Sequence, residues 1–166
     1  TLELANKTTR ALAVHPSDPN MILVGAWDGP NTGDGIYYSI DGGDSWSKAL
    51  GLDEHQQESK VPDIVFDPLD PSILYAATHG GLRVSFNTGQ TWQVYPGEMG
   101  QLPVTAIAAS TDGETTRLYI GTVGGMIEET TSVVANRQAE NIISAGVYVG
   151  ISNLKRNTQF LPIFIR

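Results

Sequence analysis

The chain has no cysteine, few basic residues and no long apolar run. Without cysteine it can form no disulfide and offers no thiolate to a metal. Ten Lys and Arg against 18 Asp and Glu leave a net charge of −8. The basic residues form no stripe, which disfavours a nucleic-acid partner. No run is long enough to span a bilayer, and no long helical pattern appears. We therefore expect a β-rich chain that binds no nucleic acid and does not span a membrane.

An eight-residue pattern occurs twice. Ser39–Trp46 reads S-I-D-G-G-D-S-W, and Ser85–Trp92 reads S-F-N-T-G-Q-T-W. Each copy lies between short apolar runs typical of strands, so each is predicted to be a hairpin turn.

The residue types of the pattern suit a turn that is closed by its own side chains. The Asp or Asn can accept backbone N–H bonds, the Ser or Thr can close the loop, and the glycine suits a positive φ. The tryptophan is expected to be largely buried. The second copy has Asn in place of Asp and should be the weaker turn. The positions concerned are Ser39, Asp41, Gly43, Ser45 and Trp46 in the first copy, and Ser85, Asn87, Gly89, Thr91 and Trp92 in the second.

Both octapeptides resemble the Asp-box, or BNR repeat, of sialidase-, sortilin- and xyloglucanase-like β-propellers. In that family the box stabilises the fold and takes no part in catalysis. The resemblance therefore implies an all-β propeller and says little about activity.

The repeat extends beyond the octapeptides. Ala11–Pro19 and Asp63–Pro71 are apolar runs that each end in x-P-x-D-P, and two further apolar runs follow each of them. Four short strands in a unit of roughly 40–50 residues are typical of a propeller blade. A third unit is degenerate, with Glu128–Thr131 where a box would stand, and residues 142–151 could form its outer strand. We predict a partial propeller of about three four-stranded antiparallel blades, with a β-sandwich as the alternative. The expected divisions are 1–60, 61–103 and 104–152 for the blades, and 153–166 for an apolar tail.

Three blades would leave sheet faces and inner-strand edges open, because closed propellers have about four to eight blades. We expect self-association, or further blades of a longer chain, to cover them. The chain begins at Thr1 rather than methionine, which suggests a processed product or a portion of a longer protein.

The last eight residues form an apolar tail. Gln159–Arg166 reads Q-F-L-P-I-F-I-R and resembles the C-termini of surface and secreted proteins from Chloroflexus-type filamentous bacteria. The resemblance implies an extracellular or cell-surface location.

The candidate binding site lies opposite the octapeptides. Up-and-down strands place the links between second and third strands at the far end of each blade, where Asp-box enzymes carry their active site. That end holds Trp27, Asp28, Asp34 and His79. Trp27 offers a flat apolar ring for sugars. Asp28 occupies the place of the catalytic aspartate of xyloglucanase-like propellers. Hydrolysis needs a second carboxylate, for which Asp34 and Glu54 are candidates. A polar hairpin tip without activity is the alternative.

Other sites are not predicted. Sialidase-like sites use three arginines to grip the carboxylate of the substrate, and the arginines of this chain fall in no pattern that matches such a triad. The histidines His15, His55 and His79 lack the spacing of metal ligands. The octapeptides also lack the spaced oxygens of a calcium loop. We expect no metal or cofactor. Three hypotheses remain: a non-enzymatic extracellular propeller module that assembles or binds glycan or protein, a fragment of a glycoside hydrolase, and an assembly factor of the photosystem II type.

Overall fold

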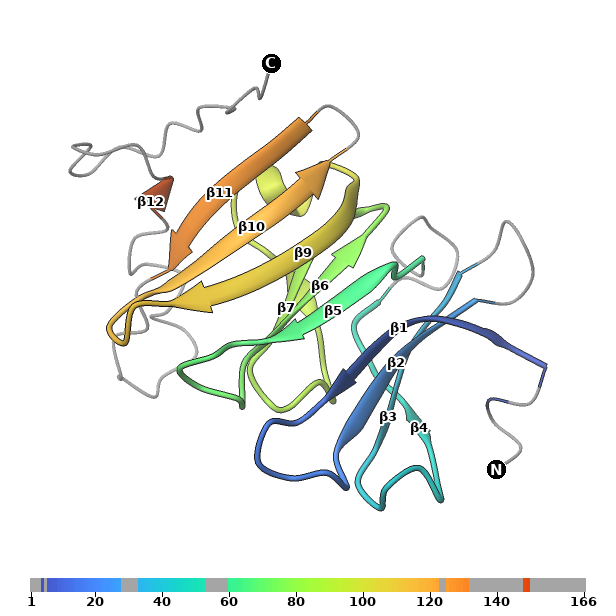
Figure 1. Ribbon diagram of the computed structural model, residues 1–166. Coiled ribbons are helices and arrows are strands. Elements are labelled where there is room, and N and C mark those ends of the chain that lie inside the picture. Colours follow the sequence, from blue (N-terminus) through green and yellow to red (C-terminus); the bar gives the residue numbers. More distant parts are fainter. Residues whose placement is uncertain are drawn as a thin grey trace.

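The computed structural model describes residue 4 and residues 6–27, 33–52, 60–122, 125–131 and 148–149. Within this part of the chain, three four-stranded antiparallel sheets follow one another (Figure 1). The first contains β1 (Thr8–Val14), β2 (Ile22–Trp27), β3 (Gly33–Ser39) and β4 (Ser47–Lys48). The second contains β5 (Asp63–Phe66), β6 (Leu74–Thr78), β7 (Gly81–Ser85) and β8 (Gln93–Val94). The third contains β9 (Val104–Thr111), β10 (Thr116–Thr122), β11 (Gly125–Thr131) and β12 (Tyr148–Val149). In each sheet the strand order follows the chain, which confirms the predicted blades.

The octapeptides connect the third and fourth strands of the first two sheets. β3 and β7 end at the first serine of each octapeptide, and the fourth strand starts one residue after the tryptophan. In the third sheet β11 continues through Glu128–Thr131, where an octapeptide would stand. Its partner β12 lies within the stretch predicted to supply the outer strand.

The innermost strands of the three sheets lie side by side. Figure 1 shows β1, β5 and β9 next to one another across the front of the molecule. Asp63 on β5 joins the second and third sheets, because its Oδ2 accepts the amide N–H of Ile107 on β9 at 3.1 Å. The sheets are thus arranged around a common centre, as blades are.

An apolar cluster fills the space between the first and second sheets. The first sheet contributes residues from β1, β2 and β3, and the second contributes residues from β5, β6 and the octapeptide. The buried members are Ala11, Ala13, Leu23, Ile36, Ala49, Val61, Ile64, Leu74, Ala76 and Trp92. Burial of this apolar area is the main force that holds neighbouring blades together.

A second apolar cluster joins the second and third sheets. It includes Tyr75 and Leu82 from the second sheet and Leu118 and Ile120 from the third. A polar link lies beside it, because the buried carboxylate of Asp67 accepts hydrogen bonds from Tyr75 and from the Thr116 hydroxyl, at 2.9 and 2.8 Å. A buried carboxylate is stable only when such donors replace water.

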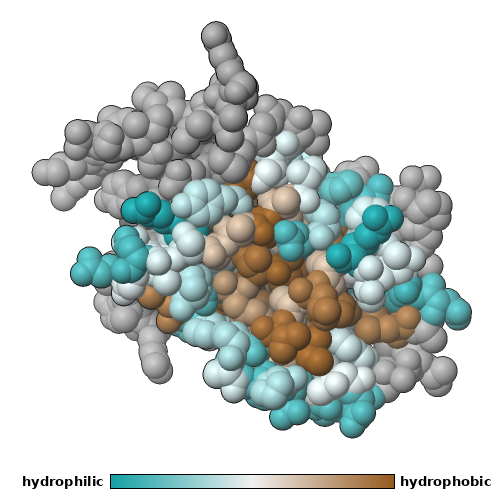
Figure 2. Space-filling view, viewed as in Figure 1, coloured by the Kyte–Doolittle hydropathy of each residue, from teal (hydrophilic) through white to brown (hydrophobic). Residues whose placement is uncertain are grey.

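The first sheet is covered differently on its two faces. Burial along β1 alternates from residue to residue in its second half. Leu12 and Val14 remain 67% and 48% exposed, because they point away from the second sheet. In Figure 2 hydrophobic atoms gather over the inner strands, where no further sheet covers them among the described residues.

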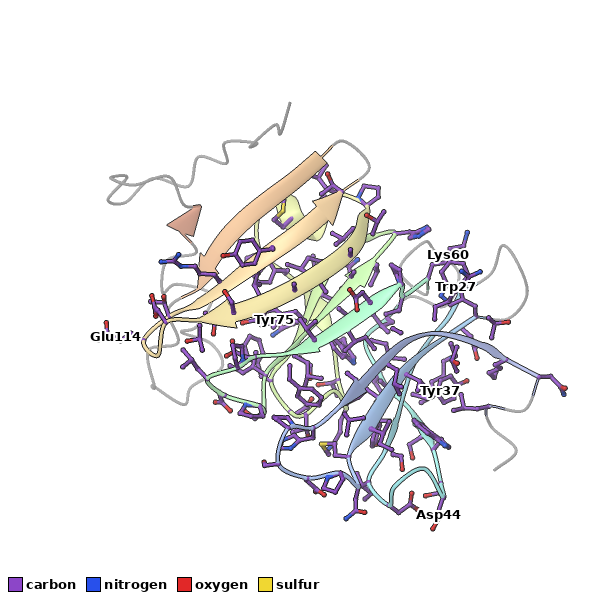
Figure 3. All side chains as sticks on the ribbon, viewed as in Figure 1. Trp27, Tyr37, Asp44, Lys60, Tyr75 and Glu114 are labelled. Carbon is purple, nitrogen blue, oxygen red and sulfur yellow. The ribbon has the colours of Figure 1, made fainter. Side chains whose placement is uncertain are left out.

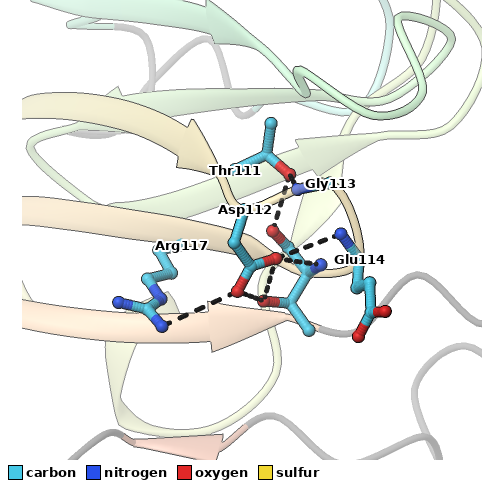
Figure 4. Close-up of polar contacts among 6 residues, drawn as sticks. Thr111, Asp112, Gly113, Glu114 and Arg117 are labelled. Atoms are coloured by element: carbon cyan, nitrogen blue, oxygen red, sulfur yellow. Dashed lines mark hydrogen bonds and ion pairs between the residues drawn. The ribbon is translucent and has the colours of Figure 1, made fainter.

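Each sheet turns from its first to its second strand through a loop closed by an aspartate. Asp18 and Asp70 each accept the backbone N–H two residues later, at 3.0 Å. In the third sheet Asp112 accepts the N–H groups of Glu114 and Thr115 at 3.0 and 2.9 Å (Figure 4). These bonds from Thr115 and Glu114 hold the pKa of Asp112 below its usual value. The degenerate unit therefore keeps this turn although it lacks the octapeptide.

Candidate functional site

The first octapeptide is a turn closed by its own side chains. Ser39 Oγ donates to Asp41 Oδ1 at 2.7 Å and accepts the N–H of Gly43 at 2.8 Å. Asp41 also accepts the backbone N–H of Ser45 at 2.9 Å and the Ser45 hydroxyl at 2.5 Å. These donors lower the pKa of Asp41 to about 2, and the Ser45 hydroxyl has the largest effect. The Trp46 indole N–H donates to the Gly43 carbonyl at 3.0 Å.

The second octapeptide repeats the same contacts. Ser85 Oγ donates to Asn87 Oδ1 and accepts the N–H of Gly89, and Asn87 Oδ1 accepts the N–H of Thr91. The Trp92 indole donates to the Gly89 carbonyl at 2.9 Å. One bond is reversed, because Asn87 Nδ2 donates to Thr91 Oγ1 where Asp41 accepts from Ser45. The amide of Asn87 thus contacts the same positions as the carboxylate of Asp41, but it carries no charge.

The backbone of both turns is left-handed at two consecutive positions. Gly43 and Gly89 have φ values of 98° and 82°. The residue before each is also left-handed: Gly42 with φ 73° in the first turn, and Thr88 with φ 54° in the second. A β-branched residue in this region is strained.

The two tryptophans differ in burial. Trp92 is 4% exposed, because it is enclosed between the first and second sheets. Trp46 is only half-buried, although both had been expected to be largely buried. It packs against the other face of the first sheet, beside Val24, Ala26 and Tyr37, where no sheet follows among the described residues.

The second turn is held by the first sheet. Leu50, just after β4, donates its N–H to Gln90 and accepts the N–H of Trp92, at 3.0 and 2.9 Å. A Cβ added to Gly51 would lie 2.0 Å from the Trp92 carbonyl oxygen, and one added to Gly89 would lie 2.1 Å from Leu23. Gly51 is therefore needed for the close approach of the two blades, whereas a side chain at Gly89 would have to displace that of Leu23.

The opposite end of the sheets brings Trp27 and His79 together. Figure 3 shows Trp27 and Lys60 far from Asp44, which belongs to the first octapeptide. The Trp27 and His79 rings meet edge to face, with centroids 5.9 Å apart. The Trp27 indole N–H reaches the Val61 carbonyl at 3.4 Å, and the Arg10 guanidinium lies 4.9 Å from the ring centroid. Neighbours from both blades thus surround Trp27, which limits the ring area left for a sugar.

The surroundings of His79 favour the neutral form of its imidazole. Burial lowers its pKa below the ordinary value, and the positive charge of Lys60 adds to this effect. A neutral imidazole can exchange hydrogen bonds with hydroxyl groups but does not attract an anion by charge.

Asp34 belongs to a different cluster. It forms ion pairs with Lys7 and, at 3.3 Å, with Lys48, and it accepts the Tyr37 hydroxyl at 2.8 Å. Burial alone would raise the pKa of Asp34, but the hydrogen bonds from Lys7 and Tyr37 and the charge of Lys48 outweigh it, so the pKa is lowered. This carboxylate is therefore held in its ionised form.

Several of these neighbours were missed by sequence reasoning. Arg10 and Lys60 flank the Trp27–His79 pair, and Lys7 binds Asp34. The pairing of β1 with β2 could have indicated Arg10, because this pairing aligns Thr8, two residues before Arg10, with Trp27. Asp28, Glu54 and His55 lie outside the described residues.

The remaining candidates for chemistry have structural positions. Arg83 is 1% exposed, and its guanidinium donates to the carbonyls of Leu82, Gly100 and Gly80. His15 Nδ1 accepts the N–H groups of Ser17 and Asp18 in the first turn. Within the described ranges no group of three or more His, Asp or Glu side chains could hold a metal. The helical segments described there include none long and apolar enough to span a membrane.

Three up-and-down sheets arranged around a common centre define part of a β-propeller. Comparison with solved structures supports this class. The chain is similar to an ancestral GH74 enzyme, with a TM-score of 0.61 and 21% identity over 80% of this chain and 20% of that one. It is also similar to YCF48 from Cyanidioschyzon merolae, with a TM-score of 0.51 and 12% identity over 75% of this chain and 34% of that one.

These similarities establish the fold alone. The chain spans about a fifth of the length of the GH74 enzyme and about a third of YCF48. No protein-family model and no curated protein sequence matches it.

Proposed function

We propose that this chain is a non-catalytic module of an Asp-box β-propeller, with a structural or assembly role. The observation that carries the proposal is the matching set of hydrogen bonds in the two octapeptide turns. In the second turn these bonds hold a tryptophan between two blades. Side chains of the repeat thus close its turns, and in the second copy they also join two sheets, which supports a structural role for the octapeptides.

The state of Asp34 favours a role without catalysis. A general acid for glycoside hydrolysis needs a raised pKa, whereas the pKa of Asp34 is lowered by its cationic and hydroxyl partners. Both of its oxygens already accept from neighbouring side chains. Asp34 is therefore a poor candidate for the general acid of a catalytic pair.

A ligand, if one is bound, would contact the end that carries Trp27 and His79. The neutral imidazole and the edge of the indole suit hydroxyl-rich groups such as those of a glycan or of a polar protein surface. We place the module outside the cell, on the resemblance of the Gln159–Arg166 tail to those of secreted proteins.

The test is a search for turnover and binding on the same samples. The chain and its Asp28→Asn variant are incubated with β-glucan and sialoside panels, and released sugars and bound ligand are measured. We expect no release by either protein, and any binding should weaken at least tenfold in His79→Ala. Turnover that is lost in Asp28→Asn would contradict the proposal.

A glycoside hydrolase fragment is the second candidate. The similarity to a GH74 enzyme over 80% of the chain favours it, together with the position of Asp28 after β2. An assembly factor of the photosystem II type is the third, and similarity to YCF48 is compatible with it at the level of the fold. The turnover assay separates the second candidate from the other two.

A further inference from the structure

The first sheet has an open face, which carries Leu12 and Val14 and points away from the second sheet. In the repeat this face corresponds to the face of the second sheet that packs on the first sheet. In the repeat Ala11 aligns with Asp63, so Leu12 corresponds to Ile64 and Ile22 to Leu74. Ile64 is 3% exposed and Leu74 is fully buried against the first sheet, whereas Leu12 is 67% exposed. The two positions have the same chemistry but differ in whether a neighbouring blade covers them.

The octapeptide tryptophans follow the same rule. Trp92 is buried against the first sheet, and its N–H donates to Leu50 of that sheet at 2.9 Å. Trp46 occupies the matching position on the open face and is half-buried. Within the described residues its amide N–H has no backbone acceptor of this kind. The open face of the first sheet therefore presents the same tryptophan that elsewhere completes an interface.

The outer face of the third sheet has the complementary pattern. In the internal interface the second sheet rests on small residues of β1, where Ala11 pairs with Gly25 and Ala13 with Leu23. On β9 Ala106 pairs with Gly121 and Ala108 with Tyr119. Since Ile107 between them is buried against the second sheet, Ala106 and Ala108 point to the other side, where both are exposed.

We propose that two copies of this chain pair through two equivalent contacts. In each contact the open first-sheet face of one copy packs onto the outer third-sheet face of the other copy. The proposal rests on the assembly role proposed above. Each contact would repeat the internal contact between blades, and two copies would bring together six blades, within the range of about four to eight that closes a propeller. Such a head-to-tail contact can close into a ring when its rotation fits.

Charge is compatible with this pairing. The chain carries a net charge of −8, so two copies repel each other in general. The central residues of the two faces are uncharged: Leu12, Val14, Ile22 and Trp46 on one side, and Ala106, Ala108, Tyr119 and Gly121 on the other. Charged side chains lie beside them, because Arg117 shares the β10 face with Tyr119, and Lys48 pairs with Tyr37 on the first sheet. Leu4 packs beside Val24 and Tyr37 and covers one half of the open face of the first sheet. The uncovered half of this face lies nearer the first octapeptide.

Sedimentation velocity of the 166-residue chain tests the proposal. We expect a mass twice that of one chain, and single-chain species in Leu12→Arg and in Ala108→Arg. Ile40→Arg is the matched control, since Ile40 is 64% exposed in the first octapeptide turn and adds the same charge away from both faces. Thermal unfolding by circular dichroism shows whether each variant is folded.

Mixing the two disrupted variants tests the head-to-tail geometry. A Leu12→Arg chain keeps an intact third-sheet face, and an Ala108→Arg chain keeps an intact first-sheet face, so their mixture should recover a two-copy species through one contact. A wild-type monomer, a larger open polymer, pairing that survives Leu12→Arg, or folded variants that fail to recover on mixing would each overturn the proposal. Glycan binding is read separately with His79→Ala, so failure of pairing does not decide the ligand question.

Discussion

Asp41 and Asn87 occupy the same position in two turns, and each accepts a hydroxyl from two residues before and an N–H from four residues after. The two residues differ in charge and in one bond, because Asp41 accepts the Ser45 hydroxyl whereas Asn87 donates to Thr91. The chain thus contains both versions of one turn, so each serves as a reference for the other.

Asp41→Asn should convert the first turn to the chemistry of the second. The pKa of Asp41 lies at about 2 in the folded chain, below its ordinary 3.8, so the ionised form is favoured by folding. The stability it contributes is therefore present above about pH 4 and lost as the pH falls through about 2. Urea unfolding should show a lower midpoint for Asp41→Asn near neutral pH, and a difference that shrinks in acid. A difference that stays constant with pH would contradict this account.

Thr88→Asn should stabilise the second turn. Thr88 holds φ 54°, a region that asparagine adopts more readily than a β-branched residue, so the gain should be about 1 kcal/mol. The reciprocal change, Gly42→Thr, introduces the same strain at φ 73° in the first turn and should lower stability by about 1–2 kcal/mol. Shifts of the same sign in chemical denaturation of the two variants would show that backbone strain is not the cause.

Trp92→Ala should destabilise the chain more than Trp46→Ala. Removing the buried Trp92 leaves a cavity between two blades and should cost about 3–5 kcal/mol. Trp46 is half-buried, so its loss should cost less in a single chain. Calorimetric unfolding at low protein concentration compares them, and equal losses would mean that Trp46 is covered as fully as Trp92.

Arg83→Met should lower stability, because it removes buried hydrogen-bond donors. The change keeps an unbranched apolar stem but removes donors from the carbonyls of Gly80 and Gly100, at a cost of about 1–3 kcal/mol. The control is Arg117→Met, because Arg117 makes an exposed ion pair of 3.7 Å with Asp112 that should contribute little. Urea denaturation compares the two variants, and comparable losses in both would be evidence against a structural role for Arg83.

The strands and turns could be predicted because their signals are local. Each octapeptide is closed by bonds within eight consecutive residues, and the first three strands of the first two sheets contain apolar runs. The exposure of Leu12 could not be read locally, because it depends on whether another sheet lies beside the first. The same limit applies to the site: Trp27 and His79 were placed at one end, but Arg10 beside the ring depends on strand register. The Asp34 pairs with Lys7 and Lys48 bring together side chains distant in sequence.

The octapeptide turns also bear on the order in which the chain folds. The side-chain bonds that close each turn join residues at most four positions apart, so forming them requires little loss of chain entropy, and hairpins of this kind form in about 1–10 μs. The bond from Thr116 to Asp67 joins residues 49 positions apart and can form only after two sheets exist. We therefore expect each β3–β4 and β7–β8 corner to be an early nucleus, with docking of one blade on the next as the slow step.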